Sequence, residues 1–272
     1  MRTTKLSFSL VVGAVCIAVL FLLMLVSLIY VPYGVNDMSI ADRLQAPGAA
    51  HLLGTDNFGR DILSRVMEGT QTAFKVGTVS VAIGLTGGLL IGTIAGYVGK
   101  WADELLMRFI DALLAFPGVL LALLLVSLFK PSLFQTMIAI GILSVPAFSR
   151  VVRSGFLHMK EAEFVKAARG IGAGHANIIF KQILPNILSP VVTTAALSFS
   201  TAILVEAALS YLGLGVQPPD PSWGRMLNES QSYIAKRPGM RSPQVYSLPS
   251  PYSALTCSAT ASETCVTNDN RR

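Results

Sequence analysis

Five long apolar stretches restrict what this chain can fold into. They lie at residues 8–30, 76–98, 109–129, 133–152 and 187–209, and each holds at most one charged residue. A helix of about 20 apolar residues crosses the hydrocarbon core of a bilayer, which is about 30 Å thick. A water-soluble helix of that length needs a polar face, which these stretches lack. We therefore predict an all-α polytopic membrane protein with five spans.

The charge content and the first stretch support a membrane protein. Charged residues make up 13% of the 272 residues, about half the share typical of a soluble domain. The alternative for residues 8–30 is a signal peptide, whose apolar core runs only about 7–15 residues. This stretch is longer and no small-x-small cleavage site follows it. We interpret it as an uncleaved first span.

The basic residues indicate an orientation, because Lys and Arg concentrate in cytoplasmic loops. Arg2 and Lys5 precede the first span, so we expect a cytoplasmic N-terminus. The segment between spans four and five then also lies in the cytoplasm, and it carries the richest basic cluster: Arg150, Arg153, Lys160, Lys166, Arg169 and Lys181. The net charge of +6 is thus attributed to topology, and we expect no nucleic-acid partner.

The loop before the second span and the span itself each have an informative pattern. The outward loop becomes amphipathic from Arg60 onward, which predicts a short helix at the membrane interface that leads into residues 76–98. The span itself carries glycines four residues apart, a spacing that lets helix backbones approach closely in lipid. We interpret the following glycines as ordinary helix packing: Gly84, Gly88, Gly92 and Gly96.

Three positions within the later spans are candidates for breaks or for the transport path. Pro117 and Pro146 should kink or interrupt spans three and four. Glu206 is an acid within the apolar run of span five. We favour a position near the outer interface, where it snorkels or caps a neighbour, over a path role. Asp111 should lie near Arg108, and beyond span five we expect an ordered loop with Trp223 as an interface anchor.

The soluble-looking insert at residues 160–186 differs from everything around it. Residues 161–171 have the periodicity of an amphipathic helix, and its apolar stripe consists of Phe164, Ala167, Ala168 and Ile171. Such a small-sided stripe suits docking into a groove of another protein. Gly172 and Gly174 should end this helix. A second helix from His175 should close at Pro185, which makes a helix–turn–helix elbow.

Several chemistries find little support in the sequence. The glycines of the elbow follow no strand and lack Gly-Lys-Ser/Thr, so they form no phosphate loop. The three cysteines and three histidines show no metal-ligand spacing, so we expect no metal or cofactor. An intramembrane enzyme would have only Asp111 and Glu206, near opposite faces. A transporter that works alone would more often show internal repeats, and none is evident.

Three motifs resemble those of a known family. Ala167-Ala168, Gly172 and Gln182-x-Leu184-Pro185 stand at the spacing of the cytoplasmic "EAA" loop of prokaryotic ATP-binding-cassette importer permeases. Lys166 replaces the usual Glu, and Gln182 replaces an Ile. "HLLGTDNFGRDILSR" and "EAALSYLGLGVQPPDPSWGRML" resemble the second permease subunit of the dipeptide, oligopeptide and nickel branch. The resemblance covers roughly residues 1–236, whereas the literal "EAA" at 206–208 lacks the Gly and Leu-Pro that should follow.

The resemblance implies a function, a fold and a set of partners. The fold would be a MetI-like helical bundle, with residues 1–75 as the first span and outward loop and 76–236 as the core. The chain would pair with a homologous permease, two ATP-binding subunits and an extracytoplasmic solute-binding protein, and it would hydrolyse no ATP itself. Leu184 and Pro185 would complete the ATPase-coupling elbow. The solute would be a di- or oligopeptide, with nickel or another small solute as the alternative.

The last 36 residues depart from this family pattern. Residues 237–272 contain Pro238, Pro243, Pro249 and Pro251 among many Ser and Thr, and no apolar run there approaches spanning length. The family usually has a sixth span at this place. We predict a disordered, non-family tail that arose from a frame change or truncation and cost the sixth span. An inactive permease is the corresponding alternative.

Overall fold

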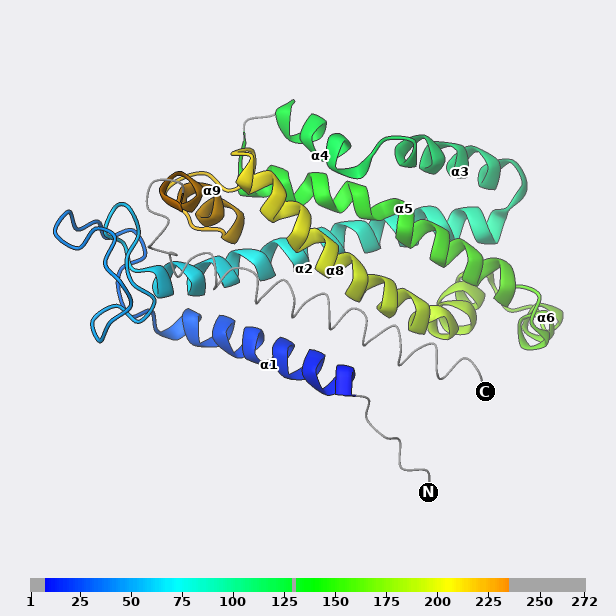
Figure 1. Cartoon of the computed structure of the whole chain (residues 1–272). Helices are drawn as coiled ribbons and strands as arrows, with labels where there is room; N and C mark the ends of the chain where they lie inside the picture. The colour runs from blue at the N-terminus through cyan, green and yellow to red at the C-terminus, as the bar shows by residue number, and fades with distance from the viewer. Residues whose placement is uncertain (1–7, 129–130, 235–272) are drawn as a thin grey trace, which may run out of the picture. The chain divides into compact units, whose positions relative to one another are not determined.

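The computed structural model describes residues 8–128 and 131–234, and these residues contain no β-strand (Figure 1). In chain order, the helical elements are α1 (Phe8–Ile29), α2 (Ile62–Val98), α3 (Lys100–Leu114), α4 (Gly118–Ser127), α5 (Leu133–Met159), α6 (Glu163–Gly170), α7 (His175–Asn177), a π-helical turn (Ile178–Ile183), a 3₁₀ turn (Leu184–Ile187), α8 (Leu188–Tyr211) and α9 (Trp223–Ile234).

Among the described residues, three helices are long and apolar enough to cross a membrane. They are α2, α5 and the continuous run His175–Tyr211 that contains α8. The pair α3 and α4 is bent by 88° and counts as a fourth only if both form one broken span. The first predicted span is the 22-residue α1, within which Ile17–Ile29 forms a shorter apolar helix. The predicted tail 237–272 lies outside the described residues.

Two compact units make up the chain, and several helices contribute to both. One unit holds Thr78–Leu125 and Ile138–Phe199, and the other holds Met1–Gly77, Val126–Met137 and Ser200–Arg272. The first unit contains the elbow, and we call it the elbow unit. The second contains the loop at 31–61 together with α9, and we call it the loop unit.

In the elbow unit, the glycine face of α2 packs directly on α5. A Cβ added to Gly84 would lie 2.6 Å from the Ser144 Cβ, and one added to Gly96 would lie 2.6 Å from the Phe156 Cβ. Such distances leave no room for a side chain, so glycine permits the close approach of the two helices. The prediction that the glycine spacing serves packing within the chain is therefore confirmed.

In the loop unit, the first turns of α2 are enclosed by the chain itself. α1 packs on this part of α2, since Phe21 and Phe74 have ring centroids 6.1 Å apart and the Gln71 amide donates to the Ser27 carbonyl over 3.0 Å. The separate interfacial helix predicted from Arg60 to the second span is wrong. α2 runs unbroken from Ile62, and Arg60 and Arg65 are buried rather than facing headgroups.

Three other local expectations need correction. The segment between the second and third predicted spans (residues 76–98 and 109–129) was expected to be a loop, but its residues 100–108 form the first part of α3. Pro117 does break the helix, as the gap between α3 and α4 shows, whereas α5 continues as one helix through the buried Pro146. Trp223 is no interface anchor. It is 2% exposed, and its indole N–H donates to the Val66 carbonyl over 3.3 Å.

Candidate functional site

The elbow begins with α6, a short helix whose ends are both explained by its sequence. Ala162 is in extended conformation at the N-cap, and Glu163 lies in the first turn, where a negative charge favours the helix dipole. At the other end, Gly172 has φ +81°. The Ala173 N–H donates to the Ala168 carbonyl and the Gly172 N–H to the Arg169 carbonyl, both over 3.0 Å. These two bonds form a Schellman motif, which favours glycine at the position of Gly172.

The predicted docking stripe is divided between two faces of α6. Ala168 is buried together with Val165, on the side that packs against the elbow unit. Phe164, Ala167 and Ile171 are exposed, and Ile171 has the highest exposure at 87%. Residues at i, i+3 and i+7 share one side of a helix, so these three form a continuous outer face. Ala168 therefore belongs to the anchoring face, which corrects the four-residue stripe.

The return from the elbow is one continuous helical run. α7 passes into the π-helical turn, and Pro185 sits at the start of the 3₁₀ turn that follows. Proline lacks an N–H and clashes with the carbonyl four residues earlier, which favours wider pairing just before it. Pro185 therefore changes the hydrogen-bonding pattern of this helical run and does not end it. Leu184 is half-buried and Pro185 is exposed, whereas Gly174 is extended and serves as the N-cap of α7.

An apolar cluster anchors the elbow to the helices of its own unit. Val165 from α6 and Ile178 and Ile183 from the return run are all buried. They share one core with the second half of α5, the 3₁₀ turn and the start of α8, through the residues Phe148, Val152, Phe156, Ile187 and Val191. Val165 and Ala168 attach one face of α6 to the elbow unit. Its outer face therefore does not pack against this core.

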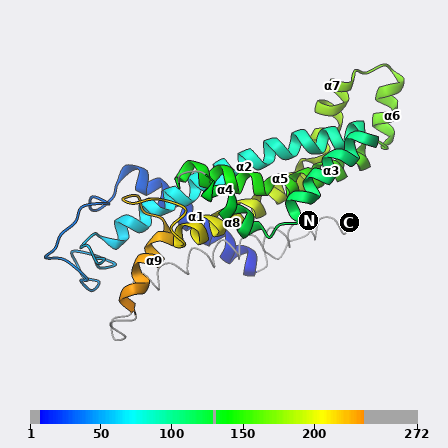
Figure 2. The same ribbon diagram turned by 90° about the horizontal axis from the view of Figure 1, so that it is seen from above.

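A second anchor, which the sequence did not reveal, ties the elbow to the last turn of α2. The Tyr97 hydroxyl and the His175 Nδ1 lie 2.6 Å apart, and their rings meet edge to face. The Arg169 guanidinium lies 5.8 Å from the centre of the Tyr97 ring. The Lys160 Nζ reaches the Gly96 carbonyl at 3.5 Å. Figure 2 shows α6 and α7 projecting at the end of the elbow unit where α2 and α5 also terminate.

Two ion pairs join α3 to α5 close to the elbow. Arg153 makes two bonds to the Asp103 carboxylate, of which that from Nη2 to Oδ2 is 2.6 Å. Arg150 Nη2 lies 2.7 Å from Asp111 Oδ1. Asp111 and Arg108 lie one turn apart on α3 as expected, but they do not form an ion pair with each other, because Arg108 pairs with Glu104 instead. The basic residues at the end of α5 thus hold α3 in place.

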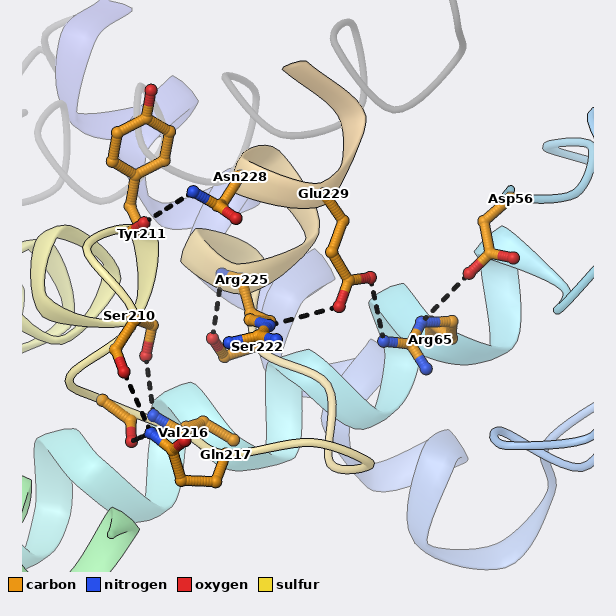
Figure 3. A network of polar contacts seen from close by, with 12 residues as sticks. Asp56, Arg65, Ser210, Tyr211, Val216, Gln217, Ser222, Arg225, Asn228 and Glu229 are labelled. Carbon is orange, nitrogen blue, oxygen red and sulfur yellow. Dashed lines mark hydrogen bonds and ion pairs between the residues drawn. The ribbon is translucent and has the colours of Figure 1, made fainter. Parts of the chain in front are cut away.

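Glu206 lies in the loop unit and is buried. It is 1% exposed, and its carboxylate accepts a 2.6 Å hydrogen bond from the Ser210 hydroxyl. Ser210 in turn accepts the Val216 N–H over 3.0 Å (Figure 3). The acid therefore does not snorkel to an interface. It stabilises the turn that follows α8, which is closer to the capping interpretation.

A buried charge cluster connects two family-like motifs that lie far apart in sequence. Arg60 bonds Asp56 at 2.6 Å and Glu229 at 2.9 Å. Arg65 lies 3.7 Å from Glu229, and Arg225 lies 3.2 Å from it (Figure 3). Except for Glu229 and Arg225, these side chains are almost completely buried. The "DNFGRDILSR" motif is thereby bonded to α9, which begins at Trp223 within the "PPDPSWGRML" motif.

Among the described residues, no group of three or more His, Cys, Asp or Glu side chains is arranged to hold a metal ion. The His51 Nδ1 lies 2.9 Å from the Asp61 Oδ1, and the Ser64 hydroxyl donates to the Asp61 Oδ2. These contacts connect the loop to the start of α2.

Comparison with known proteins decides the family. Residues 88–262, more than half of the chain, match the family model described as binding-protein-dependent transport system inner membrane component. The chain belongs to this permease family. The match extends past residue 236, into the segment predicted as a tail, so the nature of that tail stays a prediction.

Relatives of this permease carry names of peptide transport systems. The dipeptide transport system permease protein DppC of Alkalihalophilus pseudofirmus is 42% identical over 84% of this chain and 75% of its own length. The glutathione transport system permease protein GsiD of Pectobacterium atrosepticum is 40% identical over 80% and 75%. The di/tripeptide transport system permease protein DppC of Pseudomonas aeruginosa is 44% identical over 71% and 64%.

A solved structure supports the same fold. An inward-facing structure of the MetNI methionine ABC transporter aligns with a TM-score of 0.52 at 16% identity, over 71% of this chain and 94% of that one. The predicted all-α, MetI-like bundle is thus confirmed. The protein is a multi-pass inner-membrane permease subunit of an ATP-binding-cassette importer.

Proposed function

We propose that this permease translocates short peptides across the cytoplasmic membrane and that partner subunits supply the energy. Support for the substrate class comes from the relatives, whose names specify dipeptide, glutathione and di/tripeptide transport. The described residues offer no cluster suited to a metal ion as resident cofactor. Nothing in the described part of the chain favours nickel over a peptide as the solute.

The elbow is the docking element for the ATP-binding subunits. The observation that carries this proposal is the division of α6 into two faces. Val165 and Ala168 anchor the helix to the permease, while Phe164, Ala167 and Ile171 leave an apolar outer face uncovered. An amphipathic helix that presents such a face fits an apolar groove on another protein. Lys166 and Arg169, exposed beside this face, favour a groove with acidic edges.

The working assembly contains this chain, a homologous permease, two ATP-binding subunits and an extracytoplasmic solute-binding protein. The N-terminus and the elbow face the cytoplasm, as the basic residues around both favour. Closure of the ATP-binding subunits on ATP pulls on the elbow, and the helix bundles rock between outward and inward access. ATP is hydrolysed on the partner chains.

The anchors of the elbow determine how such a pull reaches the membrane helices. The apolar cluster around Val165 connects α6 to α5 and α8. The Tyr97–His175 contact connects the return run to α2. A rigidly held elbow transmits a displacement, whereas a loosely tethered one absorbs it. We therefore assign Tyr97 and His175 as positioning residues for coupling.

Co-purification tests the docking proposal. The chain is expressed with the permease and ATP-binding subunits encoded beside it, and the tagged complex is isolated in detergent. Ile171→Arg should lose the ATP-binding subunits and retain the homologous permease. Leu52→Arg is the matched control, since it places the same charge on an exposed apolar residue of the 31–61 loop. Retention of the ATP-binding subunits by Ile171→Arg would contradict docking through the outer face.

Uptake tests the substrate class. Proteoliposomes with the complete complex and its binding protein should accumulate a labelled dipeptide in an ATP-dependent manner, and unlabelled di- and tripeptides should compete. Accumulation of nickel under the same conditions, without competition by peptides, would contradict the peptide proposal.

A further inference from the structure

Helix α3 has three distinct faces. Its least exposed residues lie toward the other helices of the elbow unit and include the fully buried Ile110. A second face is apolar and uncovered, with Trp101, Leu105 and Phe109 exposed by 76%, 54% and 59%. A third carries the exposed charged residues Lys100, Glu104 and Arg108. Residues four apart fall on one line of a helix, so each set forms a continuous strip.

The two ion pairs fix how these faces are oriented. Asp103 and Asp111 lie about two helical turns apart, and they bind Arg153 and Arg150 of α5. Two attachment points along one helix prevent rotation about its axis. The strip of Trp101, Leu105 and Phe109 is therefore held away from α5 and stays uncovered because of how α3 is attached.

The next helix indicates where the membrane lies. α4 has the sequence GVLLALLLVS, without a charged residue, and Val119, Leu120 and Leu124 are exposed on it. A helix that is apolar all round belongs in hydrocarbon. α3 is bent by 88° from α4. If α4 enters the bilayer, α3 therefore extends along its surface.

We propose that α3 is an interfacial helix whose Trp101–Leu105–Phe109 strip is embedded in lipid. Amphipathic helices of this kind place apolar side chains at the boundary of the acyl chains, and Trp prefers that depth. The charged strip then faces water and headgroups, where Lys100 and Arg108 complement anionic lipid. The choice of the cytoplasmic leaflet rests on the proposed function, because it follows from the position of the elbow. The interfacial placement itself does not depend on it.

Tryptophan fluorescence tests this placement directly, because the chain contains only two tryptophans. The full chain is reconstituted in phosphatidylcholine–phosphatidylglycerol vesicles whose acyl chains carry bromine near the headgroup. Trp223 is 2% exposed and should escape the quencher, whereas Trp101 should lose most of its emission. Trp101→Phe should therefore remove the bromine-sensitive emission and leave the rest. Aqueous iodide should quench Trp101 only weakly.

Two further variants separate the faces of α3 in the Trp101→Phe background. Leu105→Trp should be quenched by the brominated lipid, and Glu104→Trp should be quenched by iodide. Equal quenching of both by iodide would place the apolar strip in water and overturn the proposal. Loss of bromine quenching at Trp101 when the homologous permease is added would also overturn it, because that protein would then cover the strip. The quenching would be unchanged even if the elbow did not bind ATP-binding subunits, so this test is independent of the docking proposal.

Discussion

At the scale of single residues, Gly172 determines how the elbow turns. Its φ of +81° is strained for most L residues, yet no atom beyond the adjacent residues lies within 4 Å of a Cβ placed there. The cost of a substitution therefore comes from the backbone and not from crowding. Gly172→Val should cost about 1–2 kcal/mol locally and reduce ATP-coupled uptake while membrane insertion stays normal.

Gly172→Asn is the control for that prediction, because Asn tolerates the left-handed conformation. It should keep most of the uptake measured in proteoliposomes. If Asn and Val were equally harmful, the effect would come from the presence of a side chain, which would contradict an origin in backbone conformation.

Tyr97 should hold the elbow through its hydroxyl group. Tyr97→Phe removes the bond to His175 and keeps the ring, at an expected cost of about 0.5–1.5 kcal/mol. The elbow contains Lys166, Arg169 and Lys181, so trypsin should cleave it faster in inside-out vesicles of this variant. Tyr211→Phe, which removes a hydroxyl bond to Gln231 in the loop unit, should leave the rate unchanged. A wild-type rate for Tyr97→Phe would show that this bond does not restrain the elbow.

Residue roles were predictable from the sequence where they depend on local conformation. Gly172 at a helix end and Pro117 at a break are of this kind, since turn geometry acts within a few residues. Ala168 was predicted on the docking face of its helix and Trp223 at the membrane interface, whereas both side chains are buried. Which face of a helix is covered depends on segments far away in the sequence, and periodicity does not show which segments those are.

At the scale of elements, the contact between α2 and α5 depends on glycine. A Cβ on Gly92 would lie 2.7 Å from the Ser149 carbonyl oxygen, a backbone atom that cannot turn away. Gly92→Leu should separate the helices at a cost of about 1–3 kcal/mol or more. The melting temperature in detergent should fall clearly. Ala82→Leu, on the exposed face of the same helix, should leave it nearly unchanged; a similar fall for both would contradict the packing account.

The long apolar spans were predictable because hydrocarbon requires both length and apolarity. The boundaries at which helices meet water were not. α2 extends to Ile62 because the loop unit buries its first turns, and α3 begins at Lys100 because ion pairs from α5 stabilise a charged helix. Both effects come from tertiary contacts, which no hydropathy window records.

At the scale of the whole molecule, Glu229 joins segments 169 residues apart by its bond to Arg60. Glu229→Ala leaves Arg60 and Arg65 buried with one carboxylate fewer. Removal of one partner from a buried pair costs about 3–5 kcal/mol, so the melting temperature in detergent should drop strongly. Glu104→Ala is the matched control, because its pair with Arg108 is exposed on both sides and worth about 0–1 kcal/mol. Equal drops would contradict a structural role for the buried cluster.

The most direct test of the account is to ask which protein touches the outer face of α6 in the working transporter. A photo-crosslinking amino acid is placed at Ile171, and separately at Leu52 as a control, and the complete complex is irradiated. A crosslink should form from position 171 to an ATP-binding subunit, and none should form to it from position 52. Absence of that crosslink in a complex that retains its ATP-binding subunits would contradict the assignment of the elbow as the coupling element.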